Sequence, residues 1–182
     1  YRLMADMYDL PPVAIHLYKK IPVGAGLGGG SSDAAATLIL LNKMFSLDLS
    51  DEVLAGHAAS LGSDCPFFIY NRPMYATGRG EVLSPVEIAL DDYRIELVIP
   101  DLFISTKEAY AGVTPRKPVV SILNIIKKPV AEWRGLLKND FEESLFLKHP
   151  GLAAEKEALY SRGAVYASMS GSGSALYGLF KK

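Results

Sequence analysis

The segment Pro22–Asp33, which reads PVGAGLGGGSSD, constrains the fold of this chain more than any other. Five of the seven positions from 24 to 30 are glycine, and glycine loses more conformational freedom on folding than any other residue. Apolar and more polar residues alternate over 13–18, which predicts a strand, and 31–45 has the apolar content of a buried helix. A flexible linker fits poorly between two such elements. Exposed amides that lead into the start of a helix instead favour an anion, most often a phosphate.

Two common phosphate-binding loops can be compared with this segment. A Walker loop needs a Gly-Lys-Ser/Thr sequence, and this loop contains no lysine. Gly24, Gly26 and Gly29 match the dinucleotide pattern G-x-G-x-x-G, which also needs a second strand with an acidic residue about 20 positions on. Residues 45–50 are too few and too polar for that strand, and Ser50 is itself predicted to cap a helix. Neither loop therefore explains the segment.

The composition is that of an ordinary globular chain. With 182 residues, 49% of them hydrophobic, and 19 basic against 20 acidic side chains, the sequence predicts a sizeable core and no nucleic-acid partner. The apolar run 34–41 is far shorter than the ~20 residues of a spanning helix, so we expect no membrane partner. A single cysteine, Cys65, cannot form an intramolecular disulfide, and we expect it to be packed in a cytoplasmic protein.

The first residues also carry a signal. Residues 1–8 have the apolar spacing of a helix, but no capping residue precedes them. We therefore expect the sequence to continue a longer protein.

Strands and helices follow one another without strict alternation, which predicts the α+β class. Ser50 and Gly62 bound one helix, and Ser105 and Glu108 form a capping box that opens another. Glycine loops occur in both halves, and we expect a boundary near residue 88 between domains 1–88 and 89–182. The remaining expected elements are strands at 67–70, 74–77, 94–99, 164–169 and 175–180, a turn at 78–80, and helices at 121–127, 130–137 and 152–162.

Several segments together resemble the GHMP kinase superfamily. The form Pro-x-Gly-x-Gly-Leu-Gly followed by Ser-Ser, at 22–32, is similar to its nucleotide loop, and 168–175, SMSGSGSA, is similar to its third motif. Residues 26–35 and 61–68, the latter LGSDCPFF, are similar to the narrower family of 4-diphosphocytidyl-2-C-methyl-D-erythritol kinases. The resemblance implies a GHMP kinase fold of the α+β class. It consists of an N-terminal ribosomal-protein-S5-like ATP-binding domain, incomplete at its start, and a C-terminal ferredoxin-like domain.

The resemblance further implies a reaction. It is the ATP-dependent phosphorylation of the 2-hydroxyl of 4-diphosphocytidyl-2-C-methyl-D-erythritol, in non-mevalonate isoprenoid biosynthesis, with ATP and Mg²⁺ as cofactors. Asp64 is then the expected catalytic base, because a carboxylate can orient an alcohol and accept its proton. The alternative is that Asp64 only caps the turn before Pro66. Tyr110 is expected to stack on the cytosine, and the alternative is a core tyrosine.

The resemblance assigns roles to residues in both glycine loops. Ser31 or Ser32 is expected to reach a phosphate oxygen or Mg²⁺, besides capping its helix. The expected ATP-binding residues are Lys19, beside the adenine, and Pro22, Val23, Gly24, Ala25, Gly26, Leu27, Gly28, Gly29, Gly30, Ser31 and Ser32. The expected substrate-binding residues are Thr106, Tyr110, Gly171, Ser172 and Gly173.

Two other functions stay open. One is another GHMP kinase, acting on homoserine or a mevalonate, and the other is a nucleotide-binding module without catalysis. The second is kept because the family's first motif, an N-terminal strand pair that supplies a lysine and part of the cytidine pocket, has no counterpart before Tyr1. We expect a small-molecule cytidyl diphosphate substrate as the partner, and a monomer or weak homodimer.

Overall fold

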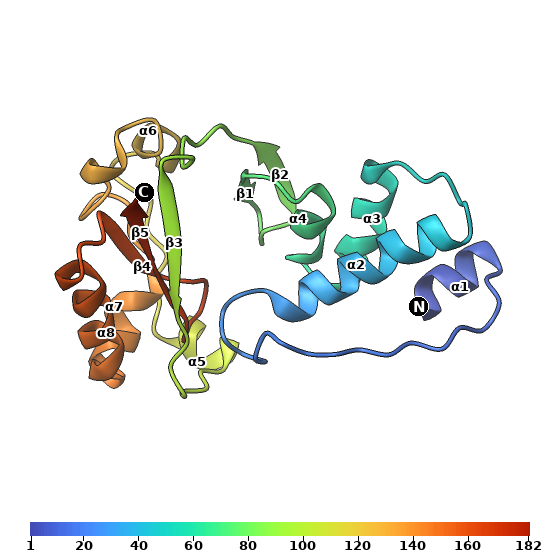
Figure 1. The fold of residues 1–182 in the computed structure, drawn as a ribbon, viewed down its shortest axis with the longest axis horizontal. Helices are drawn as coiled ribbons and strands as arrows, with labels where there is room; N and C mark the ends of the chain where they lie inside the picture. The colour runs from blue at the N-terminus through green and yellow to red at the C-terminus, as the bar shows by residue number, and fades with distance from the viewer. The chain divides into compact units, whose positions relative to one another are not determined.

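A computed structural model describes residues 1–182, which form two compact units (Figure 1). The first unit comprises Tyr1–Lys20 and Gly28–Glu87, and the second comprises Ile21–Leu27 and Ile88–Lys182. Residues 21–27 of the first glycine loop therefore belong to the second unit, whereas Gly28 and the helix after it belong to the first. The domain boundary near residue 88 stays a prediction. None of the helices is both long and apolar enough to cross a membrane.

The first unit is mostly helical. Its core is formed by Met4, Leu38, Leu41, Leu54 and Cys65, which are all at least 96% buried. Cys65 is a free, buried cysteine, as the sequence predicts. The elements are α1 (Arg2–Tyr8), α2 (Gly29–Met44), α3 (Asp51–Leu61), α4 (Cys65–Tyr70), and the antiparallel hairpin of β1 (Met74–Thr77) and β2 (Val82–Pro85).

Local signals place both ends of helix α3 correctly, but not the start of helix α2. The Ser50 hydroxyl accepts a hydrogen bond from the Val53 amide at the start of α3, and Gly62 follows its last residue. Helix α2 begins at Gly29, two residues before the predicted start at Ser31, with Gly28 in the N-cap position. Ser31 and Ser32 therefore lie inside the helix, and their predicted capping role is wrong.

Two predicted strands of this unit are wrong. Residues 67–70 belong to helix α4, which packs on α2 and α3. A short apolar run has no periodicity that separates a strand from a buried helix, and Pro66 in the first turn favours the helix. Apolar and more polar residues alternate over 13–18 as predicted, but this segment forms no strand. Neither sheet includes it, since β1 and β2 pair only with each other. Ile15 and Leu17 consequently remain largely exposed.

The second unit is built on a three-stranded antiparallel sheet with the order β3-β5-β4. Its strands are β3 (Tyr93–Val98), β4 (Tyr166–Met169) and β5 (Leu176–Lys181), with Tyr93 opposite Lys181 and Tyr166 opposite Leu179. These three strands confirm the predictions at 94–99, 164–169 and 175–180. The helices are α5 (Thr106–Ala111), α6 (Ile122–Ile125), the 3₁₀ turn η1 (Val130–Glu132), α7 (Phe141–Lys148) and α8 (Pro150–Ser161).

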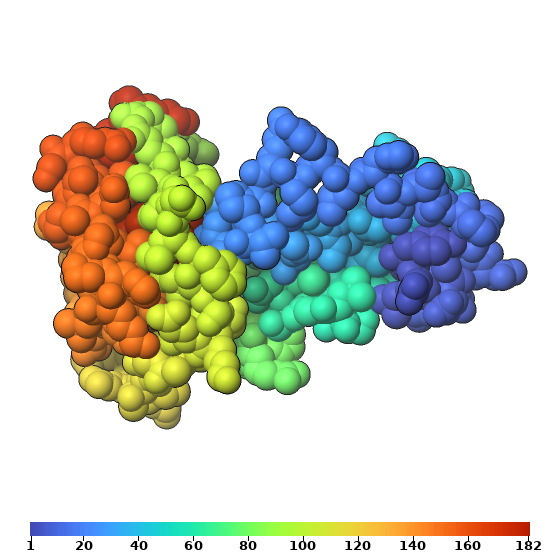
Figure 2. Space-filling view, turned by 90° about the horizontal axis from the view of Figure 1, so that it is seen from below, coloured from blue at the N-terminus to red at the C-terminus, as the bar shows by residue number.

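Both faces of this sheet are covered, so alternate residues of β4 and β5 enter two separate cores. Ala167, Leu176 and Phe180 pack with Leu145 and Leu159 from α7 and α8. On the opposite face, Tyr166 and Leu179 pack with Ile125, Val130 and Trp133. In the space-filling view the α7–α8 segment (orange) lies directly beside the segment that contains α5 (yellow-green), as their contacts also require (Figure 2).

Two helices of this unit differ from the predictions. The expected helix at 130–137 is only the turn η1, because Gly135 has φ +82°, outside the helical range. Helix α7 was missed altogether, since the mixture of charged and apolar residues over 141–148 gives no clear helical period. Helices α6 and α8 confirm the predictions at 121–127 and 152–162, and Pro150 occupies the first position of α8.

Candidate functional site

The first glycine loop has a backbone that requires glycine at alternate positions. Gly24, Gly26 and Gly28 have φ values of +76°, +71° and +65°, in the left-handed region that L side chains rarely adopt. A Cβ at Gly24 would come within 2.4 Å of the Phe103 ring, and one at Gly28 within 2.6 Å of the Phe68 ring. Backbone conformation and close packing therefore both select glycine here.

Within the second unit, the first glycine loop contacts the second one backbone to backbone. The Ser170 hydroxyl donates to the carbonyl of Gly26 at 2.7 Å, and the Ala175 amide donates to the carbonyl of Ala25 at 3.0 Å. A Cβ at Gly26 would lie 2.2 Å from the Ser170 carbonyl oxygen. Any side chain at position 26 would therefore force the two loops apart. Residues 25–26 and 170–175 thus form one structural feature, which we call the paired loops.

The second glycine loop is itself a tight turn between β4 and β5. Gly171 and Gly173 have positive φ, the Gly173 amide donates to the Ser170 carbonyl, and the Ser170 amide donates to the Ala175 carbonyl. Gly171 is exposed and Ser172 is partly exposed, whereas Gly173 is buried. The structure therefore brings three predicted substrate-binding residues, Gly171, Ser172 and Gly173, next to two predicted ATP-binding residues, Ala25 and Gly26.

In the first unit, the start of helix α2 offers free amides. Its N-cap is Gly28, no side chain caps it, and no acidic residue lies in its first turn. The amides of Gly29, Gly30 and Ser31 find no acceptor within the protein. Together with the helix dipole, such amides favour an anion at this end. This helix end lies within the segment 22–32, for which the sequence predicts a phosphate site.

Gly30 differs from the glycines before it, because the fold does not require it. A Cβ at Gly30 would meet no atom within 4 Å, and its φ is not positive. We expect Gly30→Ala to leave the melting temperature unchanged or higher, since alanine is favoured over glycine in a helix by about 0.5–1 kcal/mol. If a phosphate approaches the amides at the helix start, the added methyl group raises the KM for ATP. Steady-state kinetics and thermal unfolding of the full-length protein test both effects; an unchanged KM contradicts the predicted contact.

Asp64 stands at the N-cap position of α4 but does not cap it. Its side chain accepts no hydrogen bond from the amides of the helix, and its only hydrogen-bond partner is the Ser63 hydroxyl at 3.4 Å. The carboxylate is exposed to solvent. The alternative that Asp64 serves only as a cap is therefore wrong, and the group is free to act on a ligand. Helix α4 also links Asp64 to the phosphate site, since Phe68, one turn further on, lies against Gly28.

Lys19 forms an ion pair with Asp33 on α2. Both side chains are about one third exposed, at 32% and 36%. This pair holds the segment before the glycine loop close to helix α2 in the first unit. The predicted position of Lys19 beside an adenine stays a prediction.

Helix α5 presents the remaining predicted residues. The Ser105 hydroxyl accepts from the Glu108 amide as the capping box predicts, whereas the Glu108 carboxylate bonds His149 instead of returning to Ser105. Thr106, the first residue of the helix, is exposed. Tyr110 is 64% exposed and makes an edge-to-face contact with Phe141, with ring centroids 5.0 Å apart. The core-tyrosine alternative is therefore wrong, because most of the Tyr110 surface is exposed to solvent.

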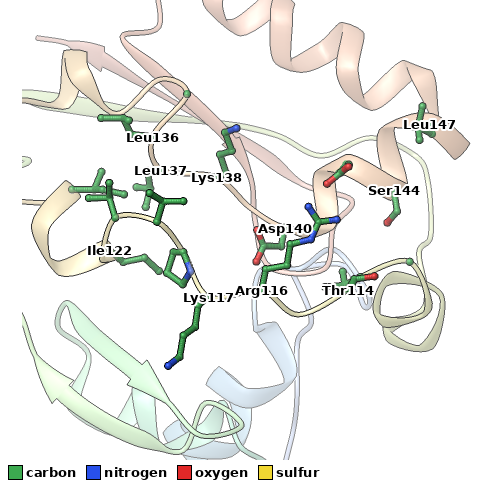
Figure 3. A pocket seen from close by; sticks show the side chains of 18 residues that line it. Thr114, Arg116, Lys117, Ile122, Leu136, Leu137, Lys138, Asp140, Ser144 and Leu147 are labelled. Atoms are coloured by element: carbon green, nitrogen blue, oxygen red, sulfur yellow. The ribbon is translucent and has the colours of Figure 1, made fainter.

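A cavity of about 790 Å³ in the second unit contains none of the predicted residues. Ile122, Leu136 and Leu137 line one side, and Arg116 and Asp140 line the other (Figure 3). The predicted residues lie instead on loops and at helix ends.

Sequence reasoning missed the residues that hold the second glycine loop in place. Asn139 and Glu142, at the start of α7, bond the backbone of residues 169–171, and Glu142 is one of only three buried polar side chains. No local pattern reveals them, because their partners lie about 30 residues further along the chain.

No group of three or more His, Cys, Asp or Glu side chains comes together as a metal site. Mg²⁺ commonly keeps several waters and binds through substrate phosphates with one or two protein oxygens. The Ser31 and Ser32 hydroxyls beside the free amides of α2 are compatible with this mode of binding.

Comparison with known proteins identifies the family. The model of the GHMP kinases N terminal domain matches residues 1–72, and that of the GHMP kinases C terminal matches residues 122–182. A protein of Azobacteroides pseudotrichonymphae named 4-diphosphocytidyl-2-C-methyl-D-erythritol kinase is 50% identical over 186 residues, which cover 100% of this chain and 68% of that protein. The chain belongs to the GHMP kinase family.

Other GHMP kinases agree with this assignment. A protein of Bacteroides thetaiotaomicron, also named 4-diphosphocytidyl-2-C-methyl-D-erythritol kinase, is 54% identical over 181 residues, and the chain spans 66% of its length. A crystal structure of a 4-(cytidine 5'-diphospho)-2C-methyl-D-erythritol kinase has a TM-score of 0.69 at 34% identity, over 88% of this chain and 59% of that one. A homoserine kinase from Cytophaga hutchinsonii, at TM-score 0.60 and 18% identity over 90% of this chain and 59% of that one, shares the GHMP kinase fold. The α+β fold class is thereby confirmed.

Proposed function

We propose that the protein carrying this chain transfers the γ-phosphoryl group of ATP to the 2-hydroxyl of 4-diphosphocytidyl-2-C-methyl-D-erythritol. One observation carries this proposal: the 54% identity to a protein of that name extends over 100% of the chain. The homoserine kinase and mevalonate kinase alternatives lack such support, since the homoserine kinase structure is only 18% identical.

The proposed roles follow the chemistry of phosphoryl transfer, which asks a protein mainly for positioning and charge stabilisation. The substrate oxygen forms a bond to the γ-phosphorus as the bond from that phosphorus to the β–γ bridging oxygen breaks, and ADP leaves. Asp64 accepts the hydroxyl proton, which its uncapped, exposed carboxylate supports. The free amides at the start of α2 support a phosphate-binding role for residues 28–32.

Mg²⁺ is proposed as the accompanying cation. When bound, it would neutralise phosphate charge, and the Ser31 or Ser32 hydroxyl would be its protein ligand. We further propose a cytoplasmic protein that is monomeric or a weak homodimer. The even balance of 19 basic and 20 acidic residues gives no sign of a nucleic-acid partner.

A substrate panel tests the proposed function. The full-length protein is incubated with ATP and Mg²⁺ and, in turn, with 4-diphosphocytidyl-2-C-methyl-D-erythritol, homoserine or mevalonate. We expect ADP formation with the cytidyl substrate alone. Turnover of homoserine or mevalonate would favour another GHMP kinase activity, and ATP binding without any turnover would favour a non-catalytic module.

Tyr110 provides a test of the proposed cytosine contact. Stacking of a base on an aromatic side chain contributes about 1–3 kcal/mol, so Tyr110→Ala is expected to raise the KM for the cytidyl substrate by roughly 5–150-fold. Tyr110→Phe keeps the ring and its contact with Phe141, and should stay near wild type. The KM for ATP is the internal control. Equal KM values for the cytidyl substrate in the alanine and phenylalanine variants would argue against stacking of Tyr110 on the cytosine.

A further inference from the structure

The outer edge of β4 is closed by side chains instead of by another strand. Strand β4 lies at one edge of the sheet, so alternate backbone groups of 167 and 169 have no strand partner. The Tyr160 hydroxyl bonds both the amide and the carbonyl of Ala167. At Met169, Glu142 accepts from the amide at 2.8 Å and Asn139 donates to the carbonyl at 2.9 Å. Three side chains thus complete this edge up to the point where the second glycine loop begins.

Glu142 is an unusual residue for this position, because its side chain is only 11% exposed. Burying a carboxylate is costly unless its oxygens are paired. Here one oxygen accepts from the Met169 amide and from the Ser168 hydroxyl, at 3.1 Å, and the other from Lys156, at 2.5 Å. An apolar residue would fill the same space without that cost but could not bond the Met169 backbone.

Asn139 extends the same support into the loop itself. Its Nδ2 donates to the carbonyls of Met169 and Gly171, at 2.9 and 2.8 Å, while its Oδ1 accepts from the Phe141 amide at 3.0 Å. Two acceptors on one side and a backbone donor on the other fix the orientation of this amide group. One side chain thereby ties the start of α7 to the exposed turn of the glycine loop.

The support continues into the first glycine loop. Ser170, between the two residues that Asn139 holds, donates to the Gly26 carbonyl, and a Cβ at Gly171 would lie 3.2 Å from that same oxygen. A displacement of 169–171 would therefore displace the paired loops as a whole. The contacts leave no room for one loop to move alone.

We infer that Asn139 and Glu142 are positioning residues, which hold the paired loops in the conformation that binds the substrates. This inference rests on the proposed function, because it assumes that the paired loops contact ATP or the cytidyl substrate. Neither residue is assigned a contact with substrate. The side chains act through the backbone of residues 169–171.

Asn139→Asp is the sharpest test, because it changes only one side of the amide group. The aspartate still accepts from the Phe141 amide, but its second oxygen now faces two carbonyls and repels them. Tyr160→Phe is the matched control, since it removes hydrogen bonds from the same edge of β4, at Ala167, without touching the loop. Melting temperature, kcat and both KM values are measured on the full-length protein.

We expect both variants to lose a few degrees of melting temperature and only Asn139→Asp to lose activity. Its kcat/KM should fall at least tenfold, with the loss concentrated in the KM of the substrate that the paired loops hold. An Asn139→Asp enzyme that loses no more activity than Tyr160→Phe overturns the inference and leaves a purely structural edge contact. If the wild-type protein itself phosphorylates no cytidyl substrate, the proposed function fails instead.

Glu142 allows a second test that does not depend on activity. Glu142→Gln keeps an oxygen for the Met169 amide, whereas Glu142→Leu fills the space without any acceptor. Hydrogen exchange of the backbone amides over 169–175 is compared in both, with Glu143→Gln, an exposed neighbour, as the control. We expect faster amide exchange and a raised KM for the substrate that the paired loops hold in Glu142→Leu. In Glu142→Gln, the exchange rate and that KM should both be close to the wild-type values. Equal exchange in the two Glu142 variants contradicts the inference.

Discussion

Replacing Asp64 by asparagine should lower kcat by roughly 10²–10⁴-fold, the range of a positioned acid or base, and leave the KM for ATP nearly unchanged. Asparagine has the size of aspartate but cannot accept the proton of the substrate hydroxyl. The fold should not suffer, because the Asp64 carboxylate is exposed and caps no helix amide. A loss confined to kcat is therefore expected from steady-state kinetics of the full-length protein, with an unchanged melting temperature.

Asp48→Asn is the matched control for this variant. Asp48 is an exposed residue of the same unit with φ +52°, a conformation that asparagine also tolerates. The same chemical change at this position should leave both kcat and stability as they are. An Asp64→Asn enzyme that works within a few-fold of the wild-type rate would exclude Asp64 as the base.

Gly26→Ala should damage stability and activity together. The left-handed φ of +71° alone costs a residue with a Cβ about 1–2 kcal/mol. The new Cβ would also lie 2.2 Å from the Ser170 carbonyl oxygen and 2.7 Å from that of Gly173, so the paired loops must separate. Because a 1 Å misplacement of binding groups can reduce a rate by ~10²-fold, we expect kcat/KM to fall by about that factor.

Gly56→Ala separates this effect from the general consequence of adding a methyl group. Gly56 lies in α3, and a Cβ there would meet nothing within 4 Å. The control should gain about 0.5–1 kcal/mol in the free energy of unfolding, because alanine is the better helix residue. Urea unfolding and kinetics of both variants provide the comparison. A Gly26→Ala protein with wild-type stability would mean that the paired loops do not pack as described.

The elements that sequence reasoning placed correctly are those fixed by local signals. The Ser50 cap, the glycine after α3 and the Gly78–Gly80 turn of the hairpin each act within a few residues, so their physics is visible in a short window. The strands β3, β4 and β5 were likewise predicted, at 94–99, 164–169 and 175–180. These signals need no knowledge of the rest of the fold.

The errors arise where a distant partner decides the conformation. Residues 67–70 are helical because α4 packs on α2 and α3, and 13–18 form no ladder because no strand lies beside them. The same holds for the candidate site. Asp64 was found from its motif, but only the structure shows that its carboxylate caps nothing. Asn139 and Glu142 were missed because their bonds reach residues 27–32 positions away.

The bond from Ser170 to Gly26 spans 144 positions of the chain, and this separation sets an order of folding during synthesis. At roughly 5–20 residues per second, residues 170–175 leave the ribosome roughly 7–30 s after Ala25 and Gly26. The first unit, which ends at Glu87, can form in that interval, on both sides of a segment that still lacks its partners. The segment 21–27 must therefore wait for residues 170–175 before it can form its native hydrogen bonds with the second glycine loop.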